Sequence, residues 1–332
     1  MDQKIRIAIN GFGRIGRSLF RILWNHPQIE VVAINDISDA RTLSHLLKYD
    51  SIHGIFNETI TYSENEILIN DIPIALQYKK KLEDLSWHNV DIVIEASGKF
   101  KTRNELEKHV AAGAKKVILS VPPVDEDIPM IVMGVNETIL NGTETILSNA
   151  SCTTNNAAPM LQVIDKLCGI EQAYITTIHS YTTDQSLHDQ PHRDLRRARA
   201  ASQSIIPTTT GAAKALTKIF PNLSSVIGGC GIRVPVPNGS LTDITFNVKE
   251  EVSIEDVNNA FKIASQTYLK DILQYTEDPI VSVDIIGNTH SCVFDSGMTS
   301  VIKKMVKIIG WYDNEIGYSS RIIDLILHIT KK

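Results

Sequence analysis

The sequence predicts an α/β fold: an N-terminal doubly wound parallel sheet, followed by a C-terminal α+β domain with a mostly antiparallel sheet. In the first half, short Ile- and Val-rich runs alternate with helical stretches, as in parallel sheets whose strands are buried on both faces. After about residue 150, longer alternating strands follow, with fewer helices between them. The chain has 332 residues, of which 43% are hydrophobic and 21% charged, so it is long enough for about two domains with sizeable cores.

The first half of the chain provides the elements of the parallel sheet. Six short apolar runs predict strands at Ile5–Asn10, Val31–Asn35, Asp91–Glu95, Lys116–Ser120, Met130–Gly134 and Thr145–Leu147. Helical stretches are expected between them at Ile15–Trp24, Ala40–Lys48 and Arg103–Ala112. Residues 57–78 differ, because the short alternating runs Thr59–Tyr62 and Glu66–Ile69 predict a small antiparallel insertion.

The second half begins with a helix, expected from near Cys152 to near Cys168, with an apolar residue every three to four positions. Long strands are expected at Ala173–Ser180, Gly228–Pro235, Leu241–Glu250, His290–Phe294 and Met305–Tyr312. Helices near Ile254–Leu269 and Ser319–Ile329 should cover the sheet. Residues 181–205 form a polar segment without periodicity, and loops of this length are uncommon unless they are functional.

Charge and cysteine usage narrow the functional classes. The net charge is −5, from 33 basic and 38 acidic residues, so we expect no nucleic-acid partner. No apolar run is long enough for a membrane span, and the N-terminus lacks the features of a signal peptide, so we expect no membrane partner and a cytoplasmic location. The four cysteines form no CxxC pair, which predicts free thiols and no metal site.

A glycine-rich motif, Asn10-Gly11-Phe12-Gly13-Arg14-Ile15-Gly16, lies between the first predicted strand and helix. Its glycines allow a tight turn and close approach of the backbone to a pyrophosphate, which a helix N-terminus favours. Asp36 follows 20 residues after Gly16, at the end of the second predicted strand, where an acidic side chain meets the adenosine ribose. The motif predicts a dinucleotide-binding (Rossmann) domain. Because a carboxylate repels a 2′-phosphate, it favours NAD over NADP.

A second motif surrounds Cys152 with small hydroxyl and amide side chains, Ser148-Asn149-Ala150-Ser151-Cys152-Thr153-Thr154-Asn155. At a helix N-terminus the dipole favours a thiolate, which lowers the pKa of the thiol. Taken alone, Cys152 is either a nucleophile or a small buried hydrophobe. The remaining cysteines lie in apolar or strand contexts and are expected in the core: Cys168, Cys230 and Cys292.

Histidine and basic residues add further candidates. His179 closes a predicted strand and begins the polar loop, where it is either the base of a thiol nucleophile or an ordinary hydrogen-bonded histidine. Arg233 lies inside a strand-like run, and a charge there usually has an anionic partner. The arginines of residues 193–199 are either solvated or phosphate ligands, and the hydroxyl-rich residues 208–211 are either a helix cap alone or a second anion site.

Together these segments resemble the phosphorylating glyceraldehyde-3-phosphate dehydrogenase family of bacterial type. The matching segments are NGFGRIGR, ASCTTN, HSYT, DLRRARAA, PTTTGAAKA, RVPVPN and WYDNE followed by GYS, and they extend from residue 10 to residue 319. The resemblance implies an NAD-binding domain at 1–150 and a catalytic domain at 151–314. Within the latter, an S-shaped loop at about 181–205 reaches a neighbouring subunit of a homotetramer. Residues 315–332 would form a C-terminal helix that packs back on the NAD domain.

The resemblance also implies a role for each matched residue. Cys152 would attack glyceraldehyde 3-phosphate to form a thiohemiacetal, and His179 would act as the base. Inorganic phosphate would then attack the thioester to release 1,3-bisphosphoglycerate. The cofactor contacts would be Gly11, Gly13, Arg14, Ile15, Gly16, Asp36, Ser120 and Asn314. The substrate phosphate would be held by Thr182, Arg197 and Arg233, with Arg196 and Arg199 as alternatives to Arg197. The attacking phosphate would bind at Ser151, Thr153, Thr210 and Gly211.

Two alternative functions stay open at this point. A relative that oxidises erythrose 4-phosphate shares the same Cys and His, and an NAD-binding regulator could retain the fold without activity. The sequence also departs from the family pattern at two positions: Asn156 replaces a second Cys, and Ile316 replaces a Trp.

Overall fold

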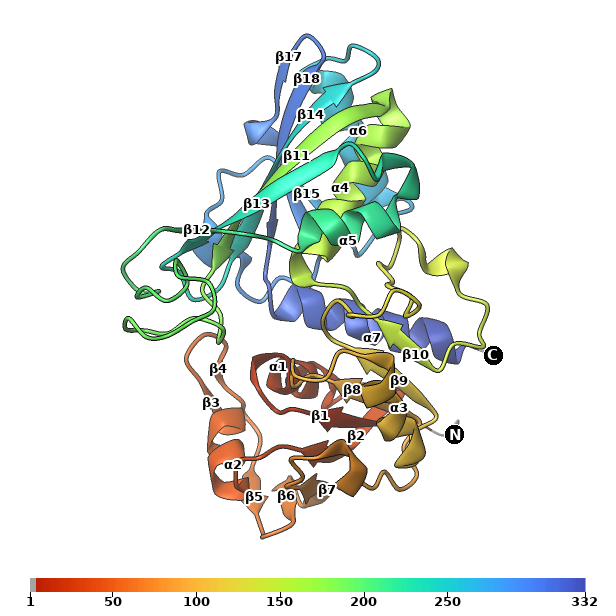
Figure 1. Cartoon of the computed structure of the whole chain (residues 1–332), viewed down its shortest axis with the longest axis vertical. Coiled ribbons are helices and arrows are strands. Elements are labelled where there is room, and N and C mark those ends of the chain that lie inside the picture. The colour runs from red at the N-terminus through yellow and green to blue at the C-terminus, as the bar shows by residue number, and fades with distance from the viewer. Residues whose placement is uncertain (1–3, 332) are drawn as a thin grey trace. The chain divides into compact units, whose positions relative to one another are not determined.

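The structure is a computed structural model that describes residues 4–331. Contacts between residues divide the described chain into two compact units. Unit 1 comprises residues 4–131, 138–150 and 319–331, and unit 2 comprises residues 132–137 and 151–318. Each unit contains one large sheet (Figure 1).

The sheet of unit 1 has eight strands in the order β10-β9-β8-β1-β2-β7-β6-β5. Its parallel strands are β1 (Ile5–Asn10), β2 (Ile29–Asn35), β7 (Ile72–Gln77), β8 (Ile92–Glu95), β9 (Lys116–Leu119) and β10 (Ile146–Ser148). The chain starts in the middle of the sheet and proceeds in both directions, which is the doubly wound topology. All four residues of β8 are buried, as expected for a central parallel strand.

Three helices of unit 1 connect these strands, and all were predicted: α1 (Arg14–Leu23), α2 (Ala40–Lys48) and α3 (Arg103–Ala111). Asp39 caps α2 by accepting from the amide of Thr42. Thr102 and Glu105 form a reciprocal capping box at the start of α3. A two-stranded hairpin, β3 (Tyr49–Asp50) with β4 (Gly54–Ile55), follows α2.

One prediction for unit 1 requires correction. Met130–Gly134 is not a strand: Met130 forms a single bridge to Ser148, and the chain then turns at Val132, whose amide donates to the Asn136 side chain. The antiparallel strands of residues 57–78 are present as β5 (Ile60–Tyr62), β6 (Glu66–Ile69) and β7. This confirms the predicted antiparallel strands, and they extend the main sheet because β7 pairs with β2.

The sheet of unit 2 is mostly antiparallel, as predicted, in the order β12-β13-β11-β14-β18-β16-β15. Its strands are β11 (Ile170–Ser180), β12 (Ile206–Thr208), β13 (Ile227–Val234), β14 (Ser240–Val248), β15 (Leu273–Thr276), β16 (Cys292–Asp295) and β18 (Met305–Tyr312), with β17 (Ser300–Ile302) paired to β18. Only the pairs β11–β13 and β15–β16 are parallel in the described sheet.

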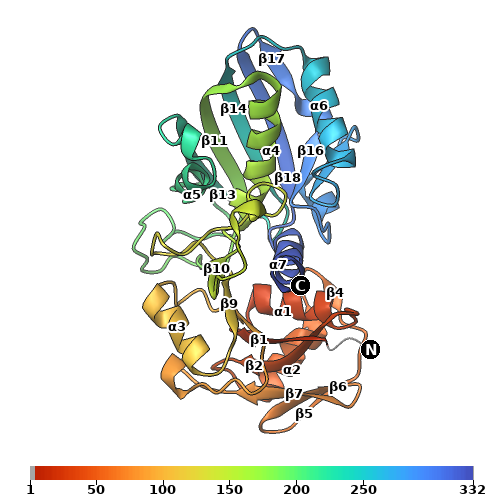
Figure 2. The same ribbon diagram turned by 90° about the vertical axis from the view of Figure 1, so that its right-hand side faces the viewer.

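Helices α4 (Cys152–Cys168), α5 (Ala212–Ile219) and α6 (Ile254–Gln266) lie together along one face of this sheet (Figure 2). Alternate residues of β14 are buried beneath them, whereas the residues between are half-buried or exposed. Residues 181–205 contain no helix or strand, in agreement with the predicted long loop. The last helix, α7 (Ile316–Thr330), buries Ile322, Leu325 and Ile326 completely.

Candidate active site

The glycine-rich loop connects β1 to α1. Each of its three glycines has different surroundings at the position that a Cβ would occupy. Gly11 has φ +94°, and a Cβ there would lie 2.5 Å from the Ser97 backbone. A Cβ at Gly16 would lie 2.3 Å from the carbonyl oxygen of Gly11. At Gly13, the N-cap of α1, no atom lies within 4 Å of the Cβ position. Packing therefore requires Gly11 and Gly16, whereas the space at Gly13 is open.

A cavity of about 310 Å³ lies at the carboxyl ends of β1, β2 and β8. Gly11, Gly13, Asp36 and Ser97 are among the residues that line it. The Asp36 carboxylate accepts from the amides of Phe12 (2.8 Å) and Ser38 (3.0 Å), which fixes the acid beside the glycine turn. A helix N-terminus, an open glycine and a fixed carboxylate are the groups that hold a dinucleotide in this fold, so the residues present fit NAD.

The other predicted cofactor residues of unit 1 have different surroundings. The Arg14 guanidinium makes two bonds to the Asp50 carboxylate, at 2.7 and 3.2 Å. Burial disfavours the charged carboxylate, but Arg14 and the amides of His53 and Ile52 lower the pKa of Asp50 to about 2. Ile15 is half-buried in the first turn of α1. Ser120 follows β9, and its amide donates to the carbonyl oxygen of Glu95.

Cys152 is the first residue of α4, and Ser151 is the N-cap of that helix. The Ser151 hydroxyl accepts from the amide of Thr154, so it serves as the cap. The helix thereby presents its N-terminus to Cys152, a half-buried residue. Burial raises the pKa of the Cys152 thiol, opposed by the Arg233 charge and by hydrogen bonds from Thr153. This differs from the lowered pKa expected from the helix dipole alone, because the site removes water from the sulfur.

His179 reaches the same point from the end of β11. Its Nε2 lies 3.4 Å from Cys152 Sγ, and its Nδ1 lies 2.7 Å from the Ser180 carbonyl oxygen. Nδ1 also lies 2.7 Å from Arg233 Nη1. In the tautomer that carries its proton on Nδ1, this proton donates to the Ser180 carbonyl oxygen, and Nε2 is the acceptor that faces the thiol. Burial and the positive charge of Arg233 lower the pKa of His179 to about 3, so the imidazole is neutral near pH 7. The pair therefore consists of a thiol and a neutral base.

Two arginines supply positive charge beside this pair. Arg233, on β13, pairs in register with His179 of β11 and donates to the Ser180 carbonyl oxygen at 2.7 Å. Arg197, from the long loop, donates to Thr208 Oγ1 at 2.9 Å and to Asp184 at 2.5 Å. Burial and the positive charge of Arg197 lower the pKa of Arg233, so the two cations are close enough to repel each other. Two guanidinium groups held together favour an anionic ligand.

Arg196 and Arg199 differ from Arg197, because both side chains are exposed and Arg199 pairs with Asp189. Thr182 is half-buried at the start of the same loop. Gly211 is the N-cap of α5, where Thr210 Oγ1 accepts from the amide of Ala212. Of the hydroxyl-rich residues 208–211, then, Thr210 contributes to the helix cap, and Gly211 leaves the first turn open.

Two further residues of unit 2 are held by hydroxyl groups: Tyr312, which was not predicted as a site residue, and Asn314, which was. Tyr312 is buried, and its hydroxyl lies 2.9 Å from Thr153 Oγ1 and 3.0 Å from Thr177 Oγ1. Its ring lies edge-on to His179, with the centroids 5.9 Å apart. Asn314 is held by Ser180 and Ser240, whose hydroxyls donate to Oδ1 at 2.9 and 3.0 Å. Tyr312 lies within the WYDNE segment, but nothing in the sequence gives its partners.

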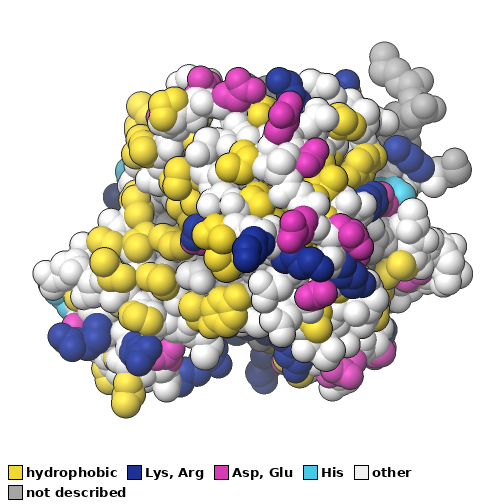
Figure 3. Space-filling model, turned by 90° about the horizontal axis from the view of Figure 1, so that it is seen from above, with side chains coloured by type: hydrophobic (Ala, Val, Ile, Leu, Met, Phe, Trp, Pro, Cys, Tyr) yellow, Lys and Arg dark blue, Asp and Glu magenta, His cyan; other side chains and the backbone are white. Residues whose placement is uncertain are grey.

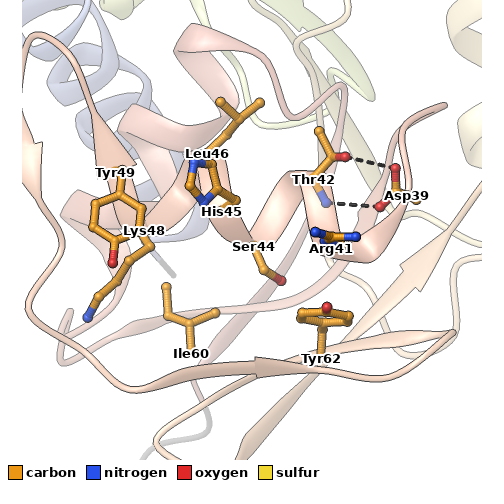
Figure 4. Close-up of a pocket in the computed structure, with 10 residues that line it drawn as sticks. All are labelled: Asp39, Arg41, Thr42, Ser44, His45, Leu46, Lys48, Tyr49, Ile60 and Tyr62. Atoms are coloured by element: carbon orange, nitrogen blue, oxygen red, sulfur yellow. Dashed lines mark hydrogen bonds between the residues drawn. The ribbon is translucent and has the colours of Figure 1, made fainter.

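A larger cavity, of about 960 Å³, lies between α2 and β5 and contains none of the predicted site residues. In Figure 4, Ile60 and Tyr62 point toward α2, while Ser44 points from the helix toward them.

Within residues 4–331, no group of three or more His, Cys, Asp or Glu side chains is placed to hold a metal ion. No helix in that range has the length and apolar character needed to cross a membrane.

Comparison with known proteins gives a consistent result along the chain. Residues 5–103 match the family model of the glyceraldehyde 3-phosphate dehydrogenase NAD binding domain, and residues 151–314 match that of the C-terminal domain. The chain is 49% identical to glyceraldehyde-3-phosphate dehydrogenase of Geobacillus stearothermophilus over 99% of both chains. It is 51% identical to glyceraldehyde-3-phosphate dehydrogenase 2 of Streptomyces avermitilis over 98% of both.

A relative of the same name in Bacillus subtilis, glyceraldehyde-3-phosphate dehydrogenase 2, is 48% identical over 99% of this chain and 98% of its own. These matches cover both units, and they agree with the dinucleotide loop of unit 1 and the thiol–imidazole pair of unit 2. The chain belongs to the glyceraldehyde-3-phosphate dehydrogenase family, whose members oxidise glyceraldehyde 3-phosphate with NAD.

Proposed function

We propose that Cys152 and His179 carry the oxidation in this chain, and that inorganic phosphate is the second substrate, giving 1,3-bisphosphoglycerate. The observation that supports this most directly is the 3.4 Å distance between Cys152 Sγ and His179 Nε2. A thiol within reach of a neutral imidazole can lose its proton to Nε2 as it attacks a carbonyl carbon.

The first half of the reaction requires a covalent bond to the substrate. An aldehyde has no hydroxyl group from which oxidation can proceed, and attack by Cys152 Sγ on C1 creates one as a thiohemiacetal. The thiol proton passes through His179 Nε2 to the new oxygen. His179 Nε2 then takes the hydroxyl proton as C1 is oxidised to a thioester, and Ser180 holds the ring through Nδ1.

The residues that would hold NAD in unit 1 are the loop glycines and Asp36, with Arg14, Ile15 and Ser120 beside them. Asn314 of unit 2 would bind the carboxamide, because Ser180 and Ser240 occupy its Oδ1 and leave its N–H groups to donate. When bound, NAD accepts the hydride from C1. The open Cβ position at Gly13 supports this placement, because a dinucleotide phosphate needs close approach to the backbone there.

In the second half, phosphate attacks the thioester carbon and Cys152 leaves as the thiolate. The substrate's own phosphate would bind Thr182, Arg197 and Arg233, since the positive charges of both arginines act on His179 and that of Arg197 also acts on Arg233. The attacking phosphate would bind near Ser151, Thr153, Thr210 and Gly211. Ser151 Oγ already caps α4 and Thr153 Oγ1 pairs with Tyr312, so we expect Thr210 and the open turn at Gly211 to contribute most.

We further propose a homotetramer located in the cytoplasm. The residues of β11 and β14 that alternate with the buried ones include Tyr174, Ile178 and Leu241, which are half-buried or exposed in the single chain. Figure 3 shows hydrophobic side chains gathered on the surface seen from above, between charged residues of both signs. Apolar surface of this kind is typical of subunit contacts. The four cysteines are free, which suits a reducing compartment.

The test is NADH formation from glyceraldehyde 3-phosphate and NAD, with and without inorganic phosphate. We expect sustained turnover only with phosphate. Cys152→Ser should lower kcat by at least about 10³-fold, because a hydroxyl is a far weaker nucleophile than a thiolate, while NAD binding survives. Cys230→Ser, at a half-buried strand position, should keep wild-type activity. Normal turnover by Cys152→Ser, or turnover with erythrose 4-phosphate alone, would contradict the proposal.

A further inference from the structure

A buried carboxylate lies below the dinucleotide cavity. Glu95 is the last residue of β8, and its side chain is completely buried. Its Oε1 accepts from the Ser97 amide (2.9 Å) and the Ser97 hydroxyl (2.5 Å). Its Oε2 accepts from Asn10 Nδ2 at 2.5 Å and lies 3.0 Å from His109 Nε2. These contacts satisfy a charge that would otherwise be costly to bury.

The proton positions in this cluster follow from the donors involved. Trp87 Nε1 can only donate, and it donates to His109 Nδ1 at 3.1 Å. His109 Nδ1 therefore has a free lone pair, and the single ring proton is on Nε2, where it donates to Glu95. His109 and Trp87 are both buried, so no solvent group competes for these bonds. In this cluster the indole N–H donates to His109 Nδ1, and His109 Nε2 donates to the Glu95 carboxyl group.

The cluster reaches the cavity through two residues. Asn10 and Ser97, both held by Glu95, line the cavity, whereas Glu95, His109 and Trp87 do not. Asn10 also accepts from the Asn35 side chain at 2.7 Å, and Asn35 is a further lining residue.

The position of Ser97 also sets the space around the glycine turn. A Cβ at Gly11 would lie 2.5 Å from the Ser97 backbone, so Ser97 and Gly11 are in close contact. A shift of the Glu95 carboxylate would therefore move Asn10 and Ser97, and with them the glycine turn.

We propose that Glu95, His109 and Trp87 form a buried positioning relay that sets the affinity of the dinucleotide site without touching the cofactor. Glu95 fixes the two strand ends that shape the cavity, His109 holds Glu95 through its Nε2–H, and Trp87 selects the tautomer of His109. This inference rests on the proposed placement of NAD in this cavity. It assigns the relay to cofactor binding and not to the chemistry at Cys152.

Glu95→Gln tests the relay with an isosteric change. The carboxamide has one acceptor oxygen, so it cannot accept from Ser97 and from both Asn10 and His109. We expect the Kd for NAD to rise at least about 10-fold, as for the loss of a charge-assisted hydrogen bond. The kcat at saturating NAD should stay within about twofold of wild type. Unchanged NAD affinity in a folded Glu95→Gln variant would overturn the proposal.

A pair of substitutions at His109 provides a rescue test. Gln offers an N–H donor and a carbonyl acceptor on one planar group, whereas Leu removes both. We expect His109→Leu to raise the Kd for NAD about 10-fold and His109→Gln to raise it less than about threefold. In protein labelled with ¹⁵N-tryptophan, the indole N–H signal of Trp87, assigned with Trp87→Phe, should move strongly in His109→Leu and less in His109→Gln.

Leu106→Ala controls for a merely structural effect, because Leu106 is buried in the same helix and packs against Val117, Leu119 and Ile128 rather than the relay. It should lower the melting temperature and leave the NAD Kd unchanged. Equal weakening of NAD binding in Leu106→Ala and His109→Leu, at equal loss of stability, would refute the relay. Wild-type protein that binds no NAD would instead refute the proposed function.

Discussion

The two candidate sites of this chain differ in whether backbone or side-chain groups form them. In unit 1, the dinucleotide loop is mainly backbone: Gly11 and Gly16 make room for the turn, and Gly13 leaves an open N-terminus. In unit 2, the nucleophile site is mainly side chains, with Cys152 from α4 and His179 from β11. A backbone site fails when a Cβ is added, whereas a side-chain site fails when a functional group is removed. This difference gives each unit its own test.

Removal of the base should have the largest effect. His179→Ala deletes the imidazole that lies 3.4 Å from Cys152 Sγ, and we expect kcat to fall about 10²- to 10⁴-fold, the usual contribution of a general base. Steady-state kinetics at saturating substrates measure it. His188→Ala, at an exposed position in the loop that follows, should keep wild-type kcat. Similar losses in both variants would show that the effect comes from the loop and not from the base.

Removal of Arg197 should be the next largest change. Arg197→Ala takes away one of the two guanidinium groups at the proposed substrate phosphate site, and we expect KM for glyceraldehyde 3-phosphate to rise about 10- to 100-fold. Arg199→Ala removes a more exposed arginine of the same segment, which pairs with Asp189, and should leave KM unchanged. If Arg199→Ala had the larger effect, the assignment between these arginines would be reversed.

Addition of a single methyl group tests the backbone site. Gly13→Ala should fold with an unfolding free energy within about 1 kcal/mol of wild type, because no atom lies within 4 Å of its Cβ. Its NAD Kd should still rise about 10-fold, since the methyl group occupies the space of the ligand. Gly16→Ala should instead lose stability, because its Cβ would lie 2.3 Å from a carbonyl oxygen. Calorimetry of NAD binding and of unfolding separates the two results.

The last test concerns stability at acid pH. The pKa of His179 is lowered by burial and Arg233 to about 3 from its ordinary 6.5. Between these values the unfolded chain binds a proton that the folded chain does not, so the unfolding free energy falls as the pH falls, by at most about 1.4 kcal/mol per pH unit. His179→Gln removes this component, and its unfolding free energy should decrease less between pH 6.5 and pH 4. Parallel pH profiles for the two proteins would contradict the buried neutral imidazole.

Much of the fold follows from local sequence patterns. The bounds of β1, α2 and α4 agree with their predictions within a residue, because apolar periodicity and capping side chains such as Asp39 are local. Met130–Gly134 was wrong because an apolar run does not say whether a neighbouring strand is available. Here the Asn136 side chain binds the amide of Val132 and turns the chain.

The two candidate sites also differ in how far the sequence alone predicts them. The glycine spacing and Asp36 identify a dinucleotide loop, because all the required backbone lies in contiguous residues. The thiol–imidazole pair joins residues 27 positions apart, and its register depends on how α4 meets the sheet. Tyr312, which binds Thr153 and Thr177 across 159 and 135 positions, has no local signal at all. The direction of the Cys152 pKa shift likewise depends on burial, which the sequence around it does not give.

The covalent intermediate is the most direct test of the account. Wild-type protein mixed with NAD and glyceraldehyde 3-phosphate in the absence of phosphate, then quenched in acid, should carry an acyl group on the peptide that contains Cys152. NADH should form in a burst of about one equivalent per site, as expected when the acyl-enzyme accumulates. Inorganic phosphate added before the quench should attack the thioester and remove the acyl group from Cys152. A burst without modification of Cys152, or modification at Cys230 instead, would contradict the central claim.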